Sequence, residues 1–406
     1  MRLVTTLRGL VPVMMLAASV WGGPASAVAE GKGGGSGGHG HSHDDGFAHH
    51  HGYSDHHGYN DERDRGNGKG DGGEGGGGGG NEDHPDVACG DVAALISAIN
   101  DANNTGAGVI TLAPSCVYTL TGAAVASGAN GPDGLPVITG NVTLMGADTT
   151  ITRSSGTAFR IAEVAPGGTL SLYGITVSNG SATTAPAGLN GGGILDAGTL
   201  LLTSSVVTGN TASNLGGGIE VANNASLTLS SSQVTNNTAG DGGGIHVNTA
   251  GTLTALSSQI SNNTASGSGG GISNFGDVTL TSVELRSNHA LNFEGGGVTT
   301  NGGNFNINGG IIDGNTAGSH GGGIANFGSQ LLLQSVVVSN NTAGQNGGGL
   351  YNASGTAQLI GDQVTGNTAN GGQGGGIFVA GGTVTLPGTT VSGNIPNNCV
   401  PGLPGC

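Results

Sequence analysis

Acidic and histidine side chains recur at one spacing in the C-terminal half of the chain. Glu220 and His246 are about 26 residues apart, as are Glu294 and His320. Asp241 stands, like Glu294 and His320, directly before a glycine triplet. If successive repeats stack, a carboxylate lies beside an imidazole, and such a pair can perform acid/base catalysis or bind a metal. The alternative is that all five side chains are solvated at positions that tolerate them.

Two aromatic residues, Tyr351 and Phe378, occupy the repeat position of Glu220 and His246. Their rings could stack on a sugar. Scattered exposed aromatics, however, usually need no functional explanation.

A second group of candidate ligands lies near the N-terminus, where histidines alternate with glycine and aspartate. Imidazole clusters bind zinc, nickel or copper, so we expect this segment to bind one of these metals, whereas the rest of the chain requires no cofactor. The histidines are His39, His41, His43, His49, His50, His51, His56 and His57.

The candidate acid/base and stacking residues belong to a long internal repeat marked by two motifs. Three glycines and an aliphatic residue recur at Ile194, Ile219, Ile245, Ile272, Val298, Ile324, Leu350 and Ile377. An asparagine, usually in Asn-Thr-Ala, recurs at Asn210, Asn237, Asn263, Asn288, Asn315, Asn341, Asn367 and Asn394. Two markers that keep one period of about 26 residues are typical of a solenoid.

Each repeat contains three short runs of alternating apolar residues, as at Ile219 and Val221, Leu227 and Leu229, and Val234. Alternation places these side chains on one face, and the equivalent positions stay apolar in every repeat. We therefore predict an all-β, right-handed parallel β-helix with three short strands per coil over residues 191–395. The asparagines are expected to form a hydrogen-bonded ladder at one corner.

An open β-helix exposes strand edges that need covering. Residues 91–100 have apolar side chains at helical spacing, which predicts a short capping helix. Irregular coils are expected to complete the segment 87–190, and a tight loop over 396–406 is expected to close the other end.

The four cysteines fall in one pair at each end of this region. In an exported protein we predict the disulfides Cys89–Cys116 and Cys399–Cys406. A zinc site needs four converging ligands at tighter spacing, so it is the weaker interpretation.

Residues 1–27 have the pattern of a secretory signal peptide, with Arg2 and Arg8, an apolar stretch and Ala25-Ser26-Ala27. The stretch is too short for a spanning helix, so we expect an extracellular protein without transmembrane anchoring. Residues 28–86 contain almost no apolar side chains and are predicted to be disordered.

The formal net charge of −16 excludes most polyanionic partners. After Lys69 only Arg153, Arg160 and Arg286 are basic, so a basic groove cannot be assembled. We expect no nucleic-acid partner.

The Gly-Gly-Gly-Ile and Asn-Thr-Ala units, together with the run from Leu135-Pro136-Val137-Ile138 to Leu144-Met145-Gly146, resemble bacterial β-helix proteins with polymorphic outer-membrane-protein repeats. They also resemble the wider pectate-lyase-like superfamily. The resemblance covers about residues 87–394 and implies a scaffold shared by adhesins, surface proteins and polysaccharide-degrading enzymes. We expect the protein to lack the translocator barrel of the outer-membrane type.

Enzymes of that superfamily use an acidic calcium cluster with a basic residue on one outer strand stack. Here the position after each glycine-triplet aliphatic contains no Arg or Lys. We therefore expect a secreted, non-enzymatic scaffold for adhesion or cell-envelope interaction, with extracellular glycans or envelope components as partners. The alternative is a carbohydrate-active enzyme, a polysaccharide lyase or hydrolase, which should show a carboxylate cluster in one cleft.

Overall fold

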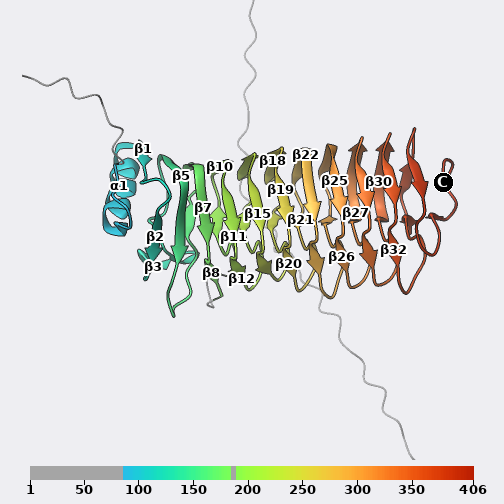
Figure 1. Ribbon diagram of the computed structural model, residues 1–406, viewed down its shortest axis with the longest axis horizontal. Coiled ribbons are helices and arrows are strands. Elements are labelled where there is room, and N and C mark those ends of the chain that lie inside the picture. The colour runs from blue at the N-terminus through green and yellow to red at the C-terminus, as the bar shows by residue number, and fades with distance from the viewer. Residues whose placement is uncertain (1–85, 184–188) are drawn as a thin grey trace, which may run out of the picture. The chain divides into compact units, whose positions relative to one another are not determined.

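The computed structural model describes residues 86–183 and 189–406, which form a parallel β-solenoid (Figure 1). The proposed signal peptide, the histidine cluster and all but the last residue of the segment 28–86 lie outside the described residues. The coils have three strands each in one 26-stranded parallel sheet. The predicted parallel β-helix is therefore confirmed.

The described residues contain a single helix, α1 (Val92–Thr105), which precedes the first coil and packs on β1 (Ala107–Thr111). It begins where the Asp91 carboxylate accepts a hydrogen bond from the amide of Ala94 at 2.9 Å. Leu95 and Ile99 are buried beneath it, as their spacing predicts. The helix extends five residues beyond the predicted end at residue 100, up to Gly106, which adopts a left-handed conformation.

The first coils are irregular. Their strands are β1, β2 (Val117–Leu120), β3 (Val125–Gly128), β4 (Gly131–Asp133), β5 (Asn141–Arg153), β6 (Ala162–Val164), β7 (Thr169–Ser178) and β8 (Ser181–Ala182). The β3–β4 pair is an antiparallel hairpin beside the parallel stack.

In the regular coils, a first strand follows each glycine triplet. These strands are β9 (Ile194–Asp196), β13 (Ile219–Val221), β17 (Ile245–Val247), β21 (Ile272–Asn274), β24 (Val298–Thr300), β27 (Ile324–Gln334), β30 (Leu350–Ile360) and β33 (Ile377–Val379), and β36 (Cys399–Val400) pairs with the last of them. β27 and β30 continue into the middle strand of their coils.

The middle and third strands complete each coil. They are β10 (Thr199–Thr203), β11 (Val206–Thr208), β14 (Ser226–Ser230), β15 (Gln233–Thr235), β18 (Thr252–Leu256), β19 (Gln259–Ser261), β22 (Asp277–Arg286), β25 (Asn304–Asp313), β28 (Val337–Ser339), β31 (Gln363–Thr365), β34 (Thr383–Thr385) and β35 (Thr390–Ser392).

A second, eight-stranded sheet was not predicted. Each of its two-residue strands follows a ladder asparagine or its N-terminal equivalent: β8, β12 (Thr211–Ala212), β16 (Thr238–Ala239), β20 (Thr264–Ala265), β23 (His289–Ala290), β26 (Thr316–Ala317), β29 (Thr342–Ala343) and β32 (Thr368–Ala369). The Thr-Ala units are thus a fourth ladder, in which each alanine is buried and each threonine faces outward.

Equivalent side chains stack as the repeat predicts. Val234 pairs with Ile260, and Ile260 pairs with Leu285 in the next coil. All three are at most 1% exposed. The same holds for the triplet column, where Ile219 pairs with Ile245. One continuous apolar core therefore runs through the coils.

The predicted asparagine ladder is present and fully hydrogen-bonded. Asn263 Nδ2 donates to Oδ1 of Asn288 at 3.1 Å and to the carbonyl of Val234 at 2.9 Å. Its Oδ1 accepts bonds from the backbone amide and Nδ2 of Asn237. The pattern repeats from Asn210 to Asn394, and every ladder asparagine is buried.

Two further polar columns were not predicted. Ser205, Ser232 and Ser258 are buried, and their hydroxyls accept amide hydrogen bonds from the preceding coil. In the first-strand row, Asn326 donates to Asn352 at 2.8 Å inside the solenoid. Both columns satisfy the backbone where the chain bends.

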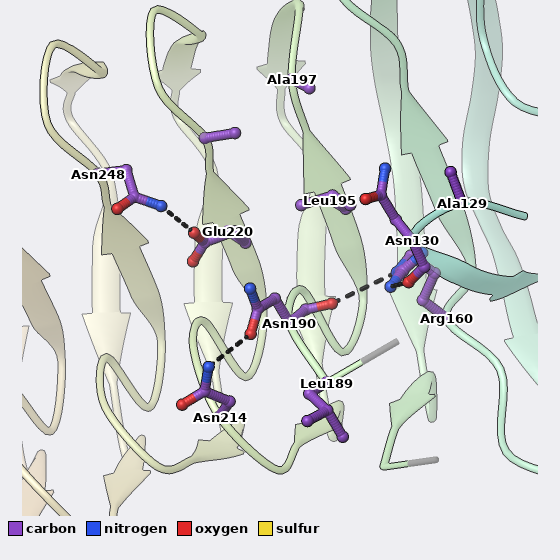
Figure 2. A pocket seen from close by; sticks show the side chains of 11 residues that line it. Ala129, Asn130, Arg160, Leu189, Asn190, Leu195, Ala197, Asn214, Glu220 and Asn248 are labelled. Carbon is purple, nitrogen blue, oxygen red and sulfur yellow. Dashed lines mark hydrogen bonds between the residues drawn. The ribbon is translucent and has the colours of Figure 1, made fainter. Parts of the chain in front are cut away.

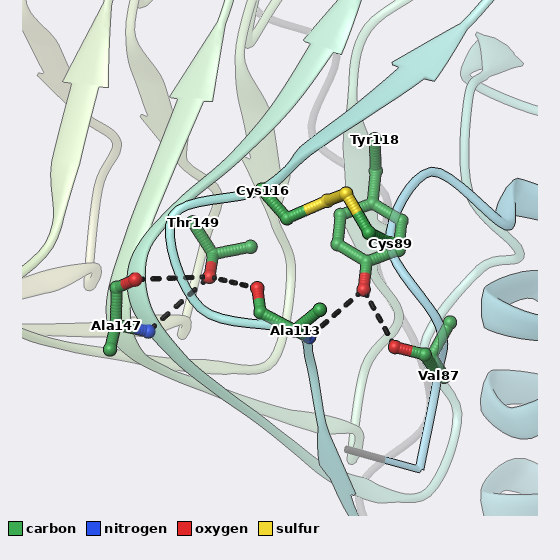
Figure 3. The surroundings of a disulfide bond; sticks show 7 residues. All are labelled: Val87, Cys89, Ala113, Cys116, Tyr118, Ala147 and Thr149. Atoms are coloured by element: carbon green, nitrogen blue, oxygen red, sulfur yellow. Dashed lines mark hydrogen bonds between the residues drawn. A yellow bond between two sulfur atoms is a disulfide. The ribbon is translucent and has the colours of Figure 1, made fainter. Parts of the chain in front are cut away.

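The two predicted disulfides are present. Cys89–Cys116 joins the segment before α1 to the start of β2 (Figure 3). Beside it the hydroxyl of Tyr118 donates to the carbonyl of Val87 and accepts from the amide of Ala113. The disulfide Cys399–Cys406 closes the C-terminal loop. None of the helices in residues 86–183 and 189–406 is long and apolar enough to cross a membrane.

Candidate functional site

The central residues of the first strands form one outward column, which we call the β9–β33 face. It consists of Leu195, Glu220, His246, Ser273, Thr299, Ala325, Tyr351 and Phe378, paired in register from coil to coil. Glu163 of β6 continues this column before Leu195. The six residues from Leu195 to Ala325 are buried and the last two are half-buried. Side chains of the adjoining turns form walls beside the column, as Asn248 does at Glu220 and Phe275 at His246.

A cavity of about 450 Å³ lies at the N-terminal end of this face (Figure 2). We call it the Arg160–Glu220 groove. Its lining is mainly amide and small apolar side chains: Ala129, Asn130, Arg160, Leu189, Asn190, Leu195, Ala197, Asn214, Glu220, Ala222 and Asn248. Figure 2 shows Leu195 between the Arg160 and Glu220 ends.

Arg160 forms one end of the groove although it is only 1% exposed. Its Nη1 lies 2.9 Å from Oδ1 of Asp133 and 3.2 Å from Oε2 of Glu163. Its Nη2 donates to the carbonyl of Asn130 at 2.6 Å, and its Nε donates to that of Asn190 at 3.4 Å. Burial raises the pKa of Asp133 to about 7, although Arg160 acts to lower it.

Glu220 forms the other end and is 1% exposed. Its Oε1 accepts a hydrogen bond from Nδ2 of Asn248 at 2.6 Å, whereas its Oε2 has no hydrogen-bond partner in the described part of the chain. Burial raises the pKa of Glu220 to about 9, and this effect outweighs the lowering of the pKa by the hydrogen bond from Asn248. The side chain is therefore a neutral carboxylic acid at pH 7.

The predicted pairing of Glu220 with His246 is correct in register, but neither side chain is solvated. His246 is 3% exposed, and its ring centroid lies 5.5 Å from that of Phe275 in the following turn. Burial lowers its pKa to about 4, so the imidazole is neutral at pH 7. The two neighbours are thus uncharged rather than an ion pair, because adjacent turns cover both.

The other three candidates lie in the turn before the triplets, in one wall of the face. Asp241 Oδ1 accepts the amide hydrogen of Ser268, and Ser268 Oγ donates to Oε2 of Glu294. His320 Nδ1 accepts the amide hydrogen of Asn346 at 3.2 Å. Asp241 and His320 thus satisfy backbone amides between coils, and Glu294 accepts from a serine hydroxyl. None of the three lines the Arg160–Glu220 groove.

An aromatic strip lies toward the C-terminal end of the same face. Tyr351 stacks on His320, with ring centroids 4.3 Å apart, and on Phe378 at 5.7 Å. Phe327 flanks Tyr351 at 6.0 Å. The two aromatics noted in the sequence are therefore members of one cluster rather than scattered rings.

Within residues 86–183 and 189–406, no three His, Cys, Asp or Glu side chains are close enough together to hold a metal ion. The metal ligands proposed for the histidine-rich segment lie outside these residues.

The sequence did not indicate the Arg160 end of the groove. Arg160 lies in the irregular coils, where no repeat aligns it with Asp133, and its only signal was its rarity as a basic residue. Asn248 was also missed, although its position directly after the first strand of its coil could have indicated it.

Fold and groove together define the chain as a parallel β-solenoid with a polar groove and an aromatic strip on one face. The chain matches no protein-family model, no curated protein sequence and no solved structure.

Proposed function

We propose that the protein is an extracellular β-helix scaffold that binds carbohydrate along the β9–β33 face. The observation that carries this proposal is the Arg160–Glu220 groove. Four asparagine amides surround an apolar floor at Leu195, and amides that can both donate and accept suit the hydroxyl groups of a sugar. The apolar floor suits its C–H face.

The aromatic strip extends this face. Tyr351 is five coils beyond Glu220, so the strip lies about 24 Å from the groove at about 4.8 Å per coil. Aromatic rings on the same face as a polar groove favour a chain-like sugar ligand that is long enough to contact both places. A solenoid presents such an extended surface without moving parts.

The same features support our proposal of an adhesive role at a cell envelope. Disulfides at both ends are compatible with an extracellular location. On the sequence motifs alone, we also propose membership of the pectate-lyase-like superfamily, with repeats of the polymorphic outer-membrane-protein type.

The experiment is a glycan screen of the full protein in which binding and product release are both monitored. We expect binding without product release. The double variant Asn130→Ala/Asn248→Ala should lose at least tenfold in affinity. Asn301→Ala is the matched control, because Asn301 is exposed at the position of Asn248 two coils further along. Equal affinity of the double variant and the control would reject the groove as the binding site.

The aromatic strip is tested separately with long glycans. Tyr351→Ala should weaken their binding about tenfold, whereas Tyr173→Ala, an exposed tyrosine on β7, should not. Equal effects would remove the strip from the site.

One observation favours a second candidate function, a glycoside hydrolase. A protonated carboxyl such as Glu220 is what a general acid requires, and Glu163 lies two coils away in the same column. The glycan screen would favour this alternative over the scaffold if wild type released product and Glu220→Gln bound the glycan equally well but released none.

A further inference from the structure

The charges around the groove bear on which carbohydrates it can accept. Arg160 is the only basic side chain among the described residues that line the groove. Its guanidinium already contacts two carboxylates and two backbone carbonyls. An anionic ligand would have to displace Asp133 or Glu163, which would leave a buried carboxylate without its cation.

Glu163 is held by a further bond. Nδ2 of Asn130 donates to its Oε1 at 2.7 Å, while its Oε2 faces Arg160. The Arg160 end is therefore a closed network in which the positive charge is matched from inside the protein. It presents amide groups to the groove rather than a cation.

The Glu220 end has no basic side chain within the lining of the groove. Oε2 of Glu220 is buried and, within residues 86–183 and 189–406, has no hydrogen-bond partner. A buried polar atom in this state is costly unless a ligand completes its hydrogen bonding. A sugar hydroxyl can do so without introducing a charge, whereas a sugar carboxylate would be buried at this end with no basic side chain of the groove lining beside it.

We infer that the Arg160–Glu220 groove selects uncharged, hydroxyl-rich glycans and discriminates against uronate, sialylated and phosphate-bearing ones. The inference deepens the proposed function and rests on it. Asn190 and Asn214 support it, because their side chains hydrogen-bond each other at 3.0 Å and so present neutral groups between the two ends. The formal net charge of −16 also disfavours the approach of anionic glycans at longer range.

The test uses a hexasaccharide of galacturonic acid in two forms, fully methyl-esterified and free acid, which differ chiefly in charge. Neutral hexasaccharides of glucose, mannose, galactose and xylose complete the panel. Affinities are measured by calorimetry at pH 7 and about 150 mM salt, where surface charges are screened beyond about 8 Å.

We expect at least one uncharged glycan to bind, and the acid form to bind at least tenfold more weakly than its ester or not at all. Asn301→Ala, which lies outside the lining of the groove, should bind the neutral ligand within about threefold of wild type. Circular dichroism establishes that the variant is folded.

Two results would overturn the inference in distinguishable ways. In the first, the acid form binds with an affinity that equals or exceeds that of every uncharged ligand, and Asn130→Ala/Asn248→Ala abolishes this binding. That result would reject charge selection and leave the proposed function standing. If no glycan of either charge binds, the proposed function fails and the inference fails with it.

Discussion

The side-chain amide of Asn248 donates a hydrogen bond to Oε1 of Glu220 across 2.6 Å, from one coil to the preceding one. This bond holds a buried carboxyl group at one end of the groove and leaves its Oε2 without a hydrogen-bond partner among the described residues. The electrostatics of the groove follow from it, because Glu220 is kept neutral by burial and oriented by a neutral partner.

The first prediction concerns the pH dependence of stability. Burial raises the pKa of Glu220 to about 9 and the pKa of Asp133 and Asp196 to about 7, whereas an unfolded carboxyl has a pKa of about 4. Between these values the folded state binds more protons. The unfolding free energy is therefore greatest in acid and falls as pH rises towards each folded pKa. The lowered pKa of His246 acts oppositely, but only below about pH 6.5.

Of Glu220, Asp133, Asp196 and His246, only Glu220 has a folded pKa that is not exceeded in the range from pH 7.5 to about 9. Wild type should lose at most about 1.4 kcal/mol per pH unit in this range, and Glu220→Gln should lose much less. Urea unfolding at pH 5, 7.5 and 9 measures the difference. Parallel curves for the two proteins above pH 7.5 would contradict the assignment.

The asparagine ladder should contribute strongly to stability. Asn263→Ala removes the acceptor of two bonds from Asn237 and the donor to Asn288, so buried polar groups lose their partners. We expect a loss of about 2–4 kcal/mol. Thr254→Ala, at an exposed position in β18, should cost about 0.5 kcal/mol or less. Denaturant midpoints compare the two variants, and similar shifts would refute a special role for the ladder.

The glycine triplets are required by close approach of adjacent coils. A Cβ on Gly217 would lie 2.3 Å from the carbonyl oxygen of Gly243, a distance that requires the coils to move apart. Gly217→Ala should therefore cost about 3 kcal/mol or more. A Cβ on Gly122 would meet no atom within 4 Å, so Gly122→Ala is the control and should be near neutral. Thermal unfolding that ranks the two variants in the reverse order would disprove this explanation.

Much of the fold could be predicted because each coil repeats the same physical requirement. The column of Val234, Ile260 and Leu285 is visible in sequence as an aliphatic three residues before each asparagine, and the structure stacks it directly. The serine column had a similar signal in the Ser-Ser pairs that end at Ser232 and Ser258, but it was not recognised.

The site was less predictable for two physical reasons. The register of Glu220 and His246 follows from the repeat, yet their burial depends on Asn248 and Phe275, whose placement over the strand is a property of the turns. The Arg160 network lies in irregular coils, where sequence separation does not indicate which residues meet.

The histidine-rich segment supplies a prediction independent of the solenoid. Titration of the full chain with zinc, nickel or copper should release or absorb heat, and replacement of His39, His41, His43, His49, His50, His51, His56 and His57 by alanine should abolish this signal. The glycan affinity of the variant should be unchanged. Identical metal titrations of variant and wild type would dispose of the proposal.

The most direct test of carbohydrate binding is a crystal structure of the protein with the tightest ligand from the glycan screen. We predict density for a sugar ring between Arg160 and Glu220, with a hydroxyl within about 3 Å of Oε2 of Glu220. An ordered ligand on any other face of the solenoid, with the groove empty, would contradict the account.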